Sequence, residues 1–251
     1  MKIISLGAGV QSTTLYLMSC AGEIERADLA IFADTGWEPK AVYEHLERLK
    51  DGDIPITVVS KGNLRNDALD TSRRIFASMP LFTKDPETHK VAMLRRQCTR
   101  EYKVEVLQKE MRRLGATAQH PFEVWIGISV DEAHRMKDSY RKYTYHRWPL
   151  IELRMSRADC RAWLENHGWD VPKSSCIGCP FHDDTYWSKL KAYSPDEFQD
   201  AVDFDIAIRD MPKIKDKVYL HKSATPLNTA VLDGSQQLDL FGNECEGMCG
   251  V

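Results

Sequence analysis

Apolar and polar residues alternate in blocks along the first half of the chain. Four mainly apolar runs have the length of buried strands, at residues 2–6, 29–32, 56–59 and 122–128. Between them, residues 11–21 and 39–49 have the spacing of helices, and strands that alternate with helices usually build a parallel sheet. We therefore expect the α/β fold class, with an open, mostly parallel sheet and helices on both of its faces.

The second half of the chain is more helical. Ser156 with Asp159 three positions later predicts a helix start, and Ser194-Pro195 with Glu197 repeats the signal. A loop rich in Cys, Pro, His and Asp, residues 172–187, lies between these helices. We expect residues 1–190 to form an α/β domain that includes this loop, and residues 191–251 to form a helical extension with a flexible tail.

Composition excludes several classes of protein. The 251 residues are 43% hydrophobic and 28% charged, which is typical of a globular chain and excludes disordered and collagen-like proteins. No apolar run approaches the ~20 residues that cross a membrane, and the apolar start is too short for a signal peptide. We therefore expect a cytoplasmic protein without a membrane partner. Its seven cysteines are then thiols, metal ligands or redox groups rather than structural disulfides.

Charge gives a local signal only. The formal net charge is −3, so bulk charge does not indicate nucleic acid. Residues 84–113 hold nine Lys and Arg against five Asp and Glu, and residues 135–161 hold eight against three. These stretches are either solvated helix faces or the walls of a groove that binds phosphates.

A glycine turn between the first strand and the first helix is a candidate phosphate site. The backbone N–H groups of such a turn converge, and the helix dipole adds positive potential. No Gly-Lys-Ser/Thr follows, which excludes a Walker loop. The turn is also similar to a dinucleotide fingerprint in which Ser12 replaces the last glycine and Asp34 stands at the ribose position, as in a dehydrogenase. A tight turn without a ligand is the third interpretation.

Four segments in order resemble signatures of the adenine nucleotide α-hydrolase-like (PP-loop) superfamily, in its sulfonucleotide (PAPS) reductase branch. Residues 5–14 resemble the pyrophosphate loop, and residues 32–38 the following Asp-Thr-Gly signature. Residues 97–103 resemble the Cys-Thr-x-x-x-Lys segment, and residues 127–135 resemble the Gly-x-x-x-x-Glu-Ser-x-x-Arg segment. A dehydrogenase predicts none of the last three. The resemblance covers residues 1–185 and implies a PP-loop, HUP-like fold.

The resemblance implies a site for ATP or adenylylated sulfate, with Mg²⁺, at the carboxyl ends of the strands. The residues implied to bind the nucleotide are Ser5, Gly7, Ala8, Gly9, Gln11, Ser12, Thr13, Asp34, Thr35 and Gly127. Val10 and Gln11 stand where the family has Lys and Asp, which removes a cation and a carboxylate from the loop. Candidates for neutralising the phosphate charge are Arg100, Lys103 and Arg135.

Four cysteines are candidate metal ligands. Cys176 and Cys179 form a Cys-x-x-Cys turn, which Cys98 and Cys160 could complete as a four-thiolate site. His182 is an alternative ligand. Cys160 shares a predicted helical face with apolar residues and could instead be a buried thiol, and a redox pair or a structural Zn²⁺ are further alternatives. The resemblance favours a [4Fe-4S] cluster, which family members with extra cysteines use.

The carboxyl-terminal tail adds Cys245 and Cys249. Glu244-Cys245 is similar to the attacking Glu-Cys-Gly of sulfonucleotide reductases, although the Leu-His that follows in the family is absent. Cys245 is therefore a candidate catalytic nucleophile, and an exposed tail without chemistry is the alternative.

The expected function is adenylylation-dependent sulfur transfer. A substrate oxygen would attack the α phosphorus of ATP, and sulfur from a cluster or from the tail would then displace AMP. The partners we expect are an adenine nucleotide, a sulfur donor protein, a nucleic-acid acceptor and a second copy of the chain. One alternative is a reductase that releases sulfite. The other is a non-catalytic nucleic-acid-binding accessory protein with structural zinc.

Overall fold

Five parallel strands form the central sheet of the computed structural model, which describes residues 1–72, 79–212 and 214–233. The strand order is β3-β2-β1-β6-β7, and every neighbouring pair is parallel. These strands are β1 (Lys2–Leu6), β2 (Leu29–Asp34), β3 (Ile56–Ser60), β6 (Phe122–Ile126) and β7 (Thr144–Arg147). The expected open parallel sheet is confirmed.

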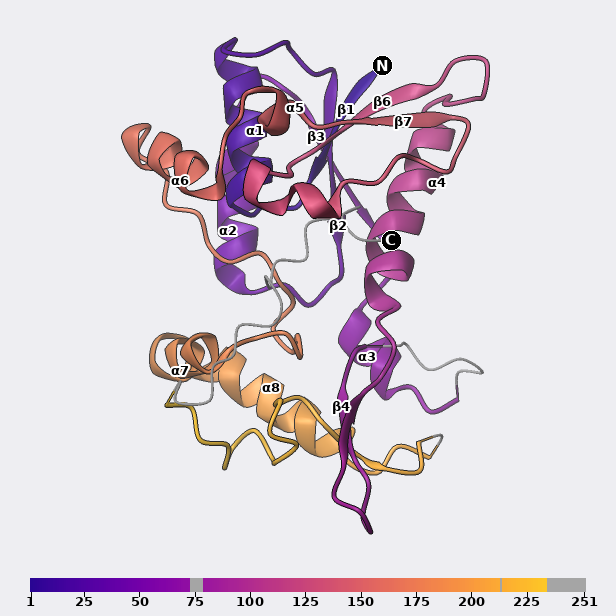
Figure 1. The fold of residues 1–251 in the computed structure, drawn as a ribbon, viewed down its shortest axis with the longest axis vertical. Helices are drawn as coiled ribbons and strands as arrows, with labels where there is room; N and C mark the ends of the chain where they lie inside the picture. The colour runs from indigo at the N-terminus through magenta and orange to yellow at the C-terminus, as the bar shows by residue number, and fades with distance from the viewer. Residues whose placement is uncertain (73–78, 213, 234–251) are drawn as a thin grey trace. The chain divides into compact units, whose positions relative to one another are not determined.

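Alternate residues of the strands face opposite sides of the sheet, and each side has its own core. Ile3 and Ile31 pack with helix α4 (Glu105–Arg113), whereas Ile4 and Phe32 pack under the two helices α1 (Val10–Ala21) and α2 (Lys40–Leu49). The ribbon shows α1 and α2 on one side of the sheet and α4 on the other (Figure 1). Helices therefore cover both faces, as the sequence predicts.

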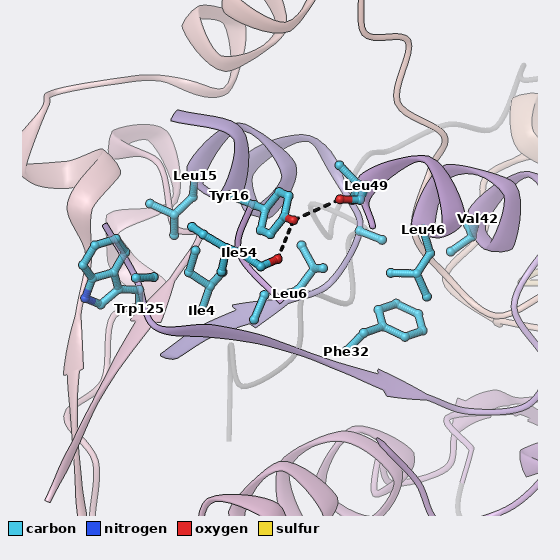
Figure 2. Close-up of a cluster of buried hydrophobic side chains, with 13 residues drawn as sticks. Ile4, Leu6, Leu15, Tyr16, Phe32, Val42, Leu46, Leu49, Ile54 and Trp125 are labelled. Carbon is cyan, nitrogen blue, oxygen red and sulfur yellow. Dashed lines mark hydrogen bonds between the residues drawn. The ribbon is translucent and has the colours of Figure 1, made fainter. Parts of the chain in front are cut away.

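A buried tyrosine ties together the core under α1 and α2. The hydroxyl of Tyr16 donates to the carbonyl oxygens of Leu49, at 3.0 Å, and Ile54, at 2.8 Å (Figure 2). Both acceptors follow or end α2, so one α1 side chain fixes the chain where it turns towards β3. The two bonds also satisfy a hydroxyl that is fully buried among apolar side chains.

The predicted helices of the second half are present with slightly different bounds. Helix α6 (Arg157–Asn166) begins at Ser156, whose side chain accepts from the Asp159 amide in a capping box. Helix α8 (Pro195–Ala207) has Pro195 in its first turn. Helix α7 (Asp184–Tyr193) begins inside the segment that we expected to be a loop up to residue 187. The Asp183 side chain accepts from the Tyr186 amide and starts this helix, a cap that the surrounding Cys and Pro residues obscured.

Two further elements have no apolar run that would predict them. The edge strand β7 reads Thr-Tyr-His-Arg, and the basic segment after Cys98 forms a π-helix, η1 (Thr99–Val104), that leads into α4. Two short helices flank β7 in sequence: the 3-10 helix η2 (Val130–Arg135) precedes it, and α5 (Pro149–Glu152) follows it.

Chain contacts divide the protein into two compact units. Among the described residues, unit 1 consists of residues 1–61 and 99–174, and unit 2 of residues 62–98 and 175–233 with the gaps given above. Unit 2 contains α7 and α8 and a three-stranded antiparallel sheet of order β5-β4-β8. Its remaining elements are α3 (Leu64–Leu69), β4 (Phe82–Lys84), β5 (Val91–Met93) and β8 (Lys217–Tyr219). This division differs from the sequence-based boundary at residue 190.

Helices are short throughout the described ranges. None of them is both long enough and apolar enough to span a lipid bilayer.

Candidate functional site

The carboxyl ends of β1, β2 and β6 meet at one edge of the parallel sheet, where ligands of open α/β folds bind. The turn after β1 carries a backbone strain there. Ala8 has φ 56°, while Gly9, the residue before α1, has φ −96°. A left-handed non-glycine residue costs on the order of 1 kcal/mol and tends to occur at functional turns. A glycine would take this conformation without strain, but the residue here is Ala8.

The start of α1 is buried under the rest of unit 1. Ser12 and Thr13 are at most 1% exposed, and the Gly7 amide donates to Ser12 Oγ at 3.1 Å. The first helical hydrogen bond runs from the Thr13 amide to the Gly9 carbonyl, at 2.9 Å. The amides of the three preceding residues belong to the helix terminus that favours anions. Ser174 closes the turn from outside by donating to the Gly7 carbonyl.

Gly127 holds β6 close to this helix start. A Cβ atom at residue 127 would lie 2.8 Å from the Ser12 nitrogen and 3.0 Å from its Cα. Both are backbone atoms, which cannot move aside as a flexible side chain would. Only glycine leaves room for α1 to begin here, so Gly127 has a steric role, and its contact with a nucleotide stays a prediction.

A network of polar side chains surrounds Gln11, which is fully buried. Gln11 Nε2 donates to Glu132 Oε2 at 3.1 Å, and Arg157 Nη1 donates to Gln11 Oε1 at 3.1 Å. Arg135 Nη1 lies 2.9 Å from the same Glu132 oxygen. Ser129 Oγ accepts from Gln11 Nε2 at 3.4 Å. A carboxylate and two guanidinium groups therefore stand beside the turn, which itself carries the uncharged Val10 and Gln11.

Arg157 is a site residue that sequence reasoning missed. It lies in the first turn of α6, where the helix dipole disfavours a cation, so helix stability does not account for it. Its amide donates to Asp131 Oδ1 at 3.0 Å. Burial opposes ionisation of Asp131, but hydrogen bonds from Ser129 and from this amide outweigh it and lower the Asp131 pKa. The capping box of Ser156 and Asp159 was the sequence signal that could have drawn attention to Arg157, because it places Arg157 at the first position of the helix.

The end of β2 forms a second polar group at this edge. Asp34 Oδ1 accepts from the Gly36 amide at 2.7 Å and from the Tyr43 hydroxyl at 2.9 Å. Burial, and then the bond to Asp34, raise the pKa of Tyr43 well above its usual range, so this hydroxyl stays protonated. Thr35 Oγ1 donates to Glu38 Oε1 at 3.0 Å.

Lys103 reaches this group from the π-helix η1. Its Nζ lies 3.6 Å from Glu38 Oε1, and the two side chains are 5% and 1% exposed. Buried charges need partners, and this pair brings a lysine and a carboxylate to the edge where β2 ends. The predicted site residue Lys103 is therefore close to Thr35. Arg100, in contrast, is an exposed residue whose Nε donates to Glu105 Oε1 at 3.0 Å.

Two of the remaining predicted residues have structural partners in unit 1. Ser5 is a buried residue of β1, and Thr13 Oγ1 lies 3.0 Å from His45 Nε2. Burial lowers the pKa of His45 to about 4, with a smaller effect from Arg48, so the ring is neutral at pH 7. An uncharged hydrogen bond between Thr13 and His45 therefore holds the first turn of α1, next to the glycine turn.

Three of the candidate ligand cysteines belong to unit 2. Cys98, Cys176 and Cys179 are half-buried thiols. Their segments are neighbours, because the guanidinium carbon of Arg96 lies 5.3 Å from the centre of the Phe181 ring. The Cys179 amide donates to the Cys176 carbonyl at 3.1 Å and closes the Cys-x-x-Cys turn.

Cys160 and His182 have surroundings of a different kind. Cys160 is fully buried in α6 of unit 1 and packs with Val10, Leu150 and Leu164. His182 Nε2 lies 2.9 Å from the Cys176 carbonyl oxygen and therefore donates to it. That bond makes the ring a support of the cysteine turn.

The thiols have the right chemistry for a soft metal centre, because thiolates are the ligands of zinc and of iron–sulfur clusters. In the part of the chain that the structure describes, however, no three His, Cys, Asp or Glu side chains form a group that could hold a metal ion. The geometry therefore gives the four-thiolate site no support of its own. Cys245 lies outside the described residues.

Comparison with known proteins leaves the family open. No protein-family model matches the chain, and no curated protein is similar to it.

Proposed function

We propose that the protein is a PP-loop enzyme that binds ATP and uses it to adenylylate an acceptor before sulfur transfer. The observation that carries the proposal is the network of Gln11, Glu132, Arg135 and Arg157 around the strained turn after β1. A polar cluster of this kind is costly to bury and to position, which is typical of a functional site.

The α1 terminus would hold the α phosphate of ATP. The amides at the helix start and the helix dipole suit an anion, and the left-handed Ala8 bends the backbone of the turn. Arg157 and Arg135 supply positive charge at the turn, in place of the lysine that Val10 replaces. Glu132 supplies the carboxylate that position 11 lacks. The family's loop chemistry would thus be provided by residues from η2 and α6.

The proposed reaction has two steps. An acceptor oxygen attacks the α phosphorus, the bond to the β-phosphate oxygen breaks, and pyrophosphate leaves. A sulfur nucleophile then attacks the acceptor carbon, and AMP departs with the oxygen. Positive charge fixed beside the phosphates stabilises the charge that develops in the first step. Asp34, at the end of β2, and Glu132, which bonds to Gln11, are the carboxylates that would hold Mg²⁺, which prefers oxygen ligands.

We also propose an iron–sulfur centre, but it takes part in neither step of this reaction. Cys98, Cys176 and Cys179 are the residues that would hold it. A brown anaerobic preparation with absorbance near ~400 nm would support it. A colourless preparation with one zinc per chain would instead indicate a structural metal.

Pyrophosphate release is the decisive measurement. Purified protein with Mg²⁺ and α-³²P-labelled ATP should form labelled AMP, or an AMP-labelled acceptor, together with pyrophosphate. A reductase would instead yield sulfite from adenylylated sulfate and no pyrophosphate. If neither product forms and ATP does not bind, the protein is not this enzyme.

Arg157→Met tests the network directly. We expect a loss of about tenfold or more in ATP turnover, because removing one donor to a developing charge costs several kcal/mol in comparable sites. Arg157→Lys should recover part of the activity. Arg161→Met is the matched control, since Arg161 is an exposed residue one turn further along α6. Equal effects of the two methionine variants would contradict the role of Arg157.

A further inference from the structure

A basic loop precedes the edge strand β7. We call residues 136–143 the β7 loop, which begins where η2 ends and runs back alongside β7 before the strand starts (Figure 1). Two hydrogen bonds tie the loop to the strand. The Lys137 carbonyl oxygen lies 2.7 Å from His146 Nδ1, and it can only accept. Ser139 Oγ lies 2.7 Å from Thr144 Oγ1. The loop is therefore held in place as part of unit 1.

The charges of the β7 loop are unbalanced. It carries Lys137, Arg141 and Lys142 against one carboxylate, Asp138. The three cations are exposed, and none of them has an ion-pair partner among the described residues. Cations gathered in one loop repel one another and do not stabilise the fold, so the pattern indicates a surface that attracts a polyanion.

Aromatic side chains stand among these cations. Tyr140 is 63% exposed, and the guanidinium carbon of Arg141 lies 4.6 Å from the centre of its ring. At the end of the loop, the Arg112 guanidinium carbon of α4 lies 5.7 Å from the centre of the Tyr143 ring. Arg112 thus adds a fourth cation next to the loop. An exposed ring beside an arginine is a surface on which a nucleic-acid base stacks.

We propose that the β7 loop binds single-stranded nucleic acid. Lys137, Arg141 and Lys142 contact phosphates, and a base stacks on the exposed ring of Tyr140. These contacts reach only phosphates and the faces of bases, which DNA and RNA share.

Two other polyanionic partners match this surface less well. A duplex covers the faces of its bases, so it gains no stacking contact from Tyr140. Segments that bind a membrane surface bring Trp, Phe or Leu side chains to it, and the β7 loop contains none of these.

The β7 loop leads directly to the proposed phosphate site. Arg135 precedes the loop, and its Nη1 lies 2.9 Å from Glu132, which bonds to Gln11 beside the glycine turn. The four residues of β7 span about 13 Å, so a polymer bound along the loop can also place one nucleotide at the turn. The loop thus names the acceptor of the proposed function and rests on it for that role, but binding to the loop can be measured without ATP.

The first test follows the fluorescence anisotropy of a labelled single-stranded DNA of about 12 nucleotides with the full chain, in the absence of ATP. We expect binding that weakens with salt. The slope of log affinity against log salt should be about −2, because each of three phosphate contacts contributes about −0.7. No binding at low salt, or binding of the same sequence as a duplex that is at least as tight, would overturn the proposal. Binding to anionic lipid vesicles that excess single strand does not displace would overturn it as well.

Two variants locate the contacts. Tyr140→Ala should weaken binding of the single strand about tenfold with an unchanged salt slope, because it removes a stacking surface and no phosphate contact. Lys142→Gln should reduce the slope by about 0.7. The matched controls are Tyr193→Ala and Lys189→Gln, at exposed residues of α7 in unit 2. Equal losses in the two tyrosine variants, or in the two lysine variants, would contradict the site.

The measurements also separate this proposal from the proposed function. Binding of the single strand without release of pyrophosphate from ATP would retain the β7 loop as a binding surface and refute the enzyme. Pyrophosphate release by a protein that does not bind the single strand would refute the role of the β7 loop alone.

Discussion

Position 11 illustrates how single residues define this site. An aspartate there would place a negative charge beside the turn, whereas the Gln11 amide offers both a donor and an acceptor. Its two ends bind groups of opposite charge, Glu132 at 3.1 Å and Arg157 at 3.1 Å. The charged groups that the turn itself lacks are therefore supplied by Glu132 and Arg157, the partners of Gln11. A charged residue at this fully buried position would need a different set of partners.

His45 gives a prediction at the same scale. Its pKa is about 4 in the folded protein and near 6.5 when unfolded, so the unfolded state binds more protons between these values. The free energy of unfolding should therefore fall as the pH drops from about 6.5 to about 4, by up to about 3 kcal/mol from this group. Denaturation at a series of pH values measures the slope.

His45→Gln should flatten that slope, because glutamine can still bond to Thr13 but does not titrate. His120→Gln, at an exposed residue of the same unit, should leave it unchanged. An unaltered slope in His45→Gln would show that other groups cause the acid sensitivity.

The end of β6 comes close to the first turn of α1. The register of β1 against β6 pairs Ser5 with Ile126, so the next residue of the β6 chain is Gly127. The parallel arrangement brings the chain after both strands to the same edge, which is why a residue distant in sequence limits the geometry of the glycine turn.

Gly127→Ala should displace the start of α1. The new methyl group would meet backbone atoms at 2.8–3.1 Å, so we expect a loss of about 1–3 kcal/mol in stability and weaker ATP binding. Thermal unfolding and a nucleotide titration measure the two effects.

Gly22→Ala separates strain from steric clash. Gly22 ends α1 with φ 74° and has open space around it, so this substitution should cost about 1 kcal/mol and leave nucleotide affinity unchanged. If Gly127→Ala binds nucleotide as well as the unaltered protein does, the glycine turn is not the binding element.

The protein consists of two units that are stabilised by different interactions. Unit 1 has extensive apolar cores on both faces of its sheet. In unit 2, a buried carboxylate has a comparable role: Asp205 accepts from the Leu220 amide at 2.7 Å and the Leu227 amide at 3.0 Å, and it pairs with Arg209. One side chain of α8 thus fixes the chain that follows β8.

Asp205→Ala should destabilise the protein by about 3–5 kcal/mol, because it leaves two buried amides and a guanidinium without their acceptor. Asp203→Ala is the matched control, since Asp203 is an exposed residue two positions away on α8 that accepts from Gln199 Nε2. Urea denaturation of the two variants gives the comparison. Similar small losses would show that Asp205 is not an anchor.

The sequence by itself determined the elements whose signals are local. Apolar runs predicted β1, β2, β3 and β6, and the cap at Ser156 predicted α6 within two residues, because burial and capping act over a few neighbouring positions. The glycine turn was predicted for the same reason. Strand β7 was not, since a polar edge strand is defined by the neighbour it pairs with.

Only the tertiary structure decided which distant residues meet at the turn. Arg157 bonds to Gln11 across 146 positions, and Lys103 reaches Glu38 from a π-helix with no sequence signature. It also shows that Cys160 packs in an apolar cluster of unit 1, whereas the other three candidate cysteines belong to unit 2. Such contacts depend on strand order and helix packing, which no local pattern of residues specifies.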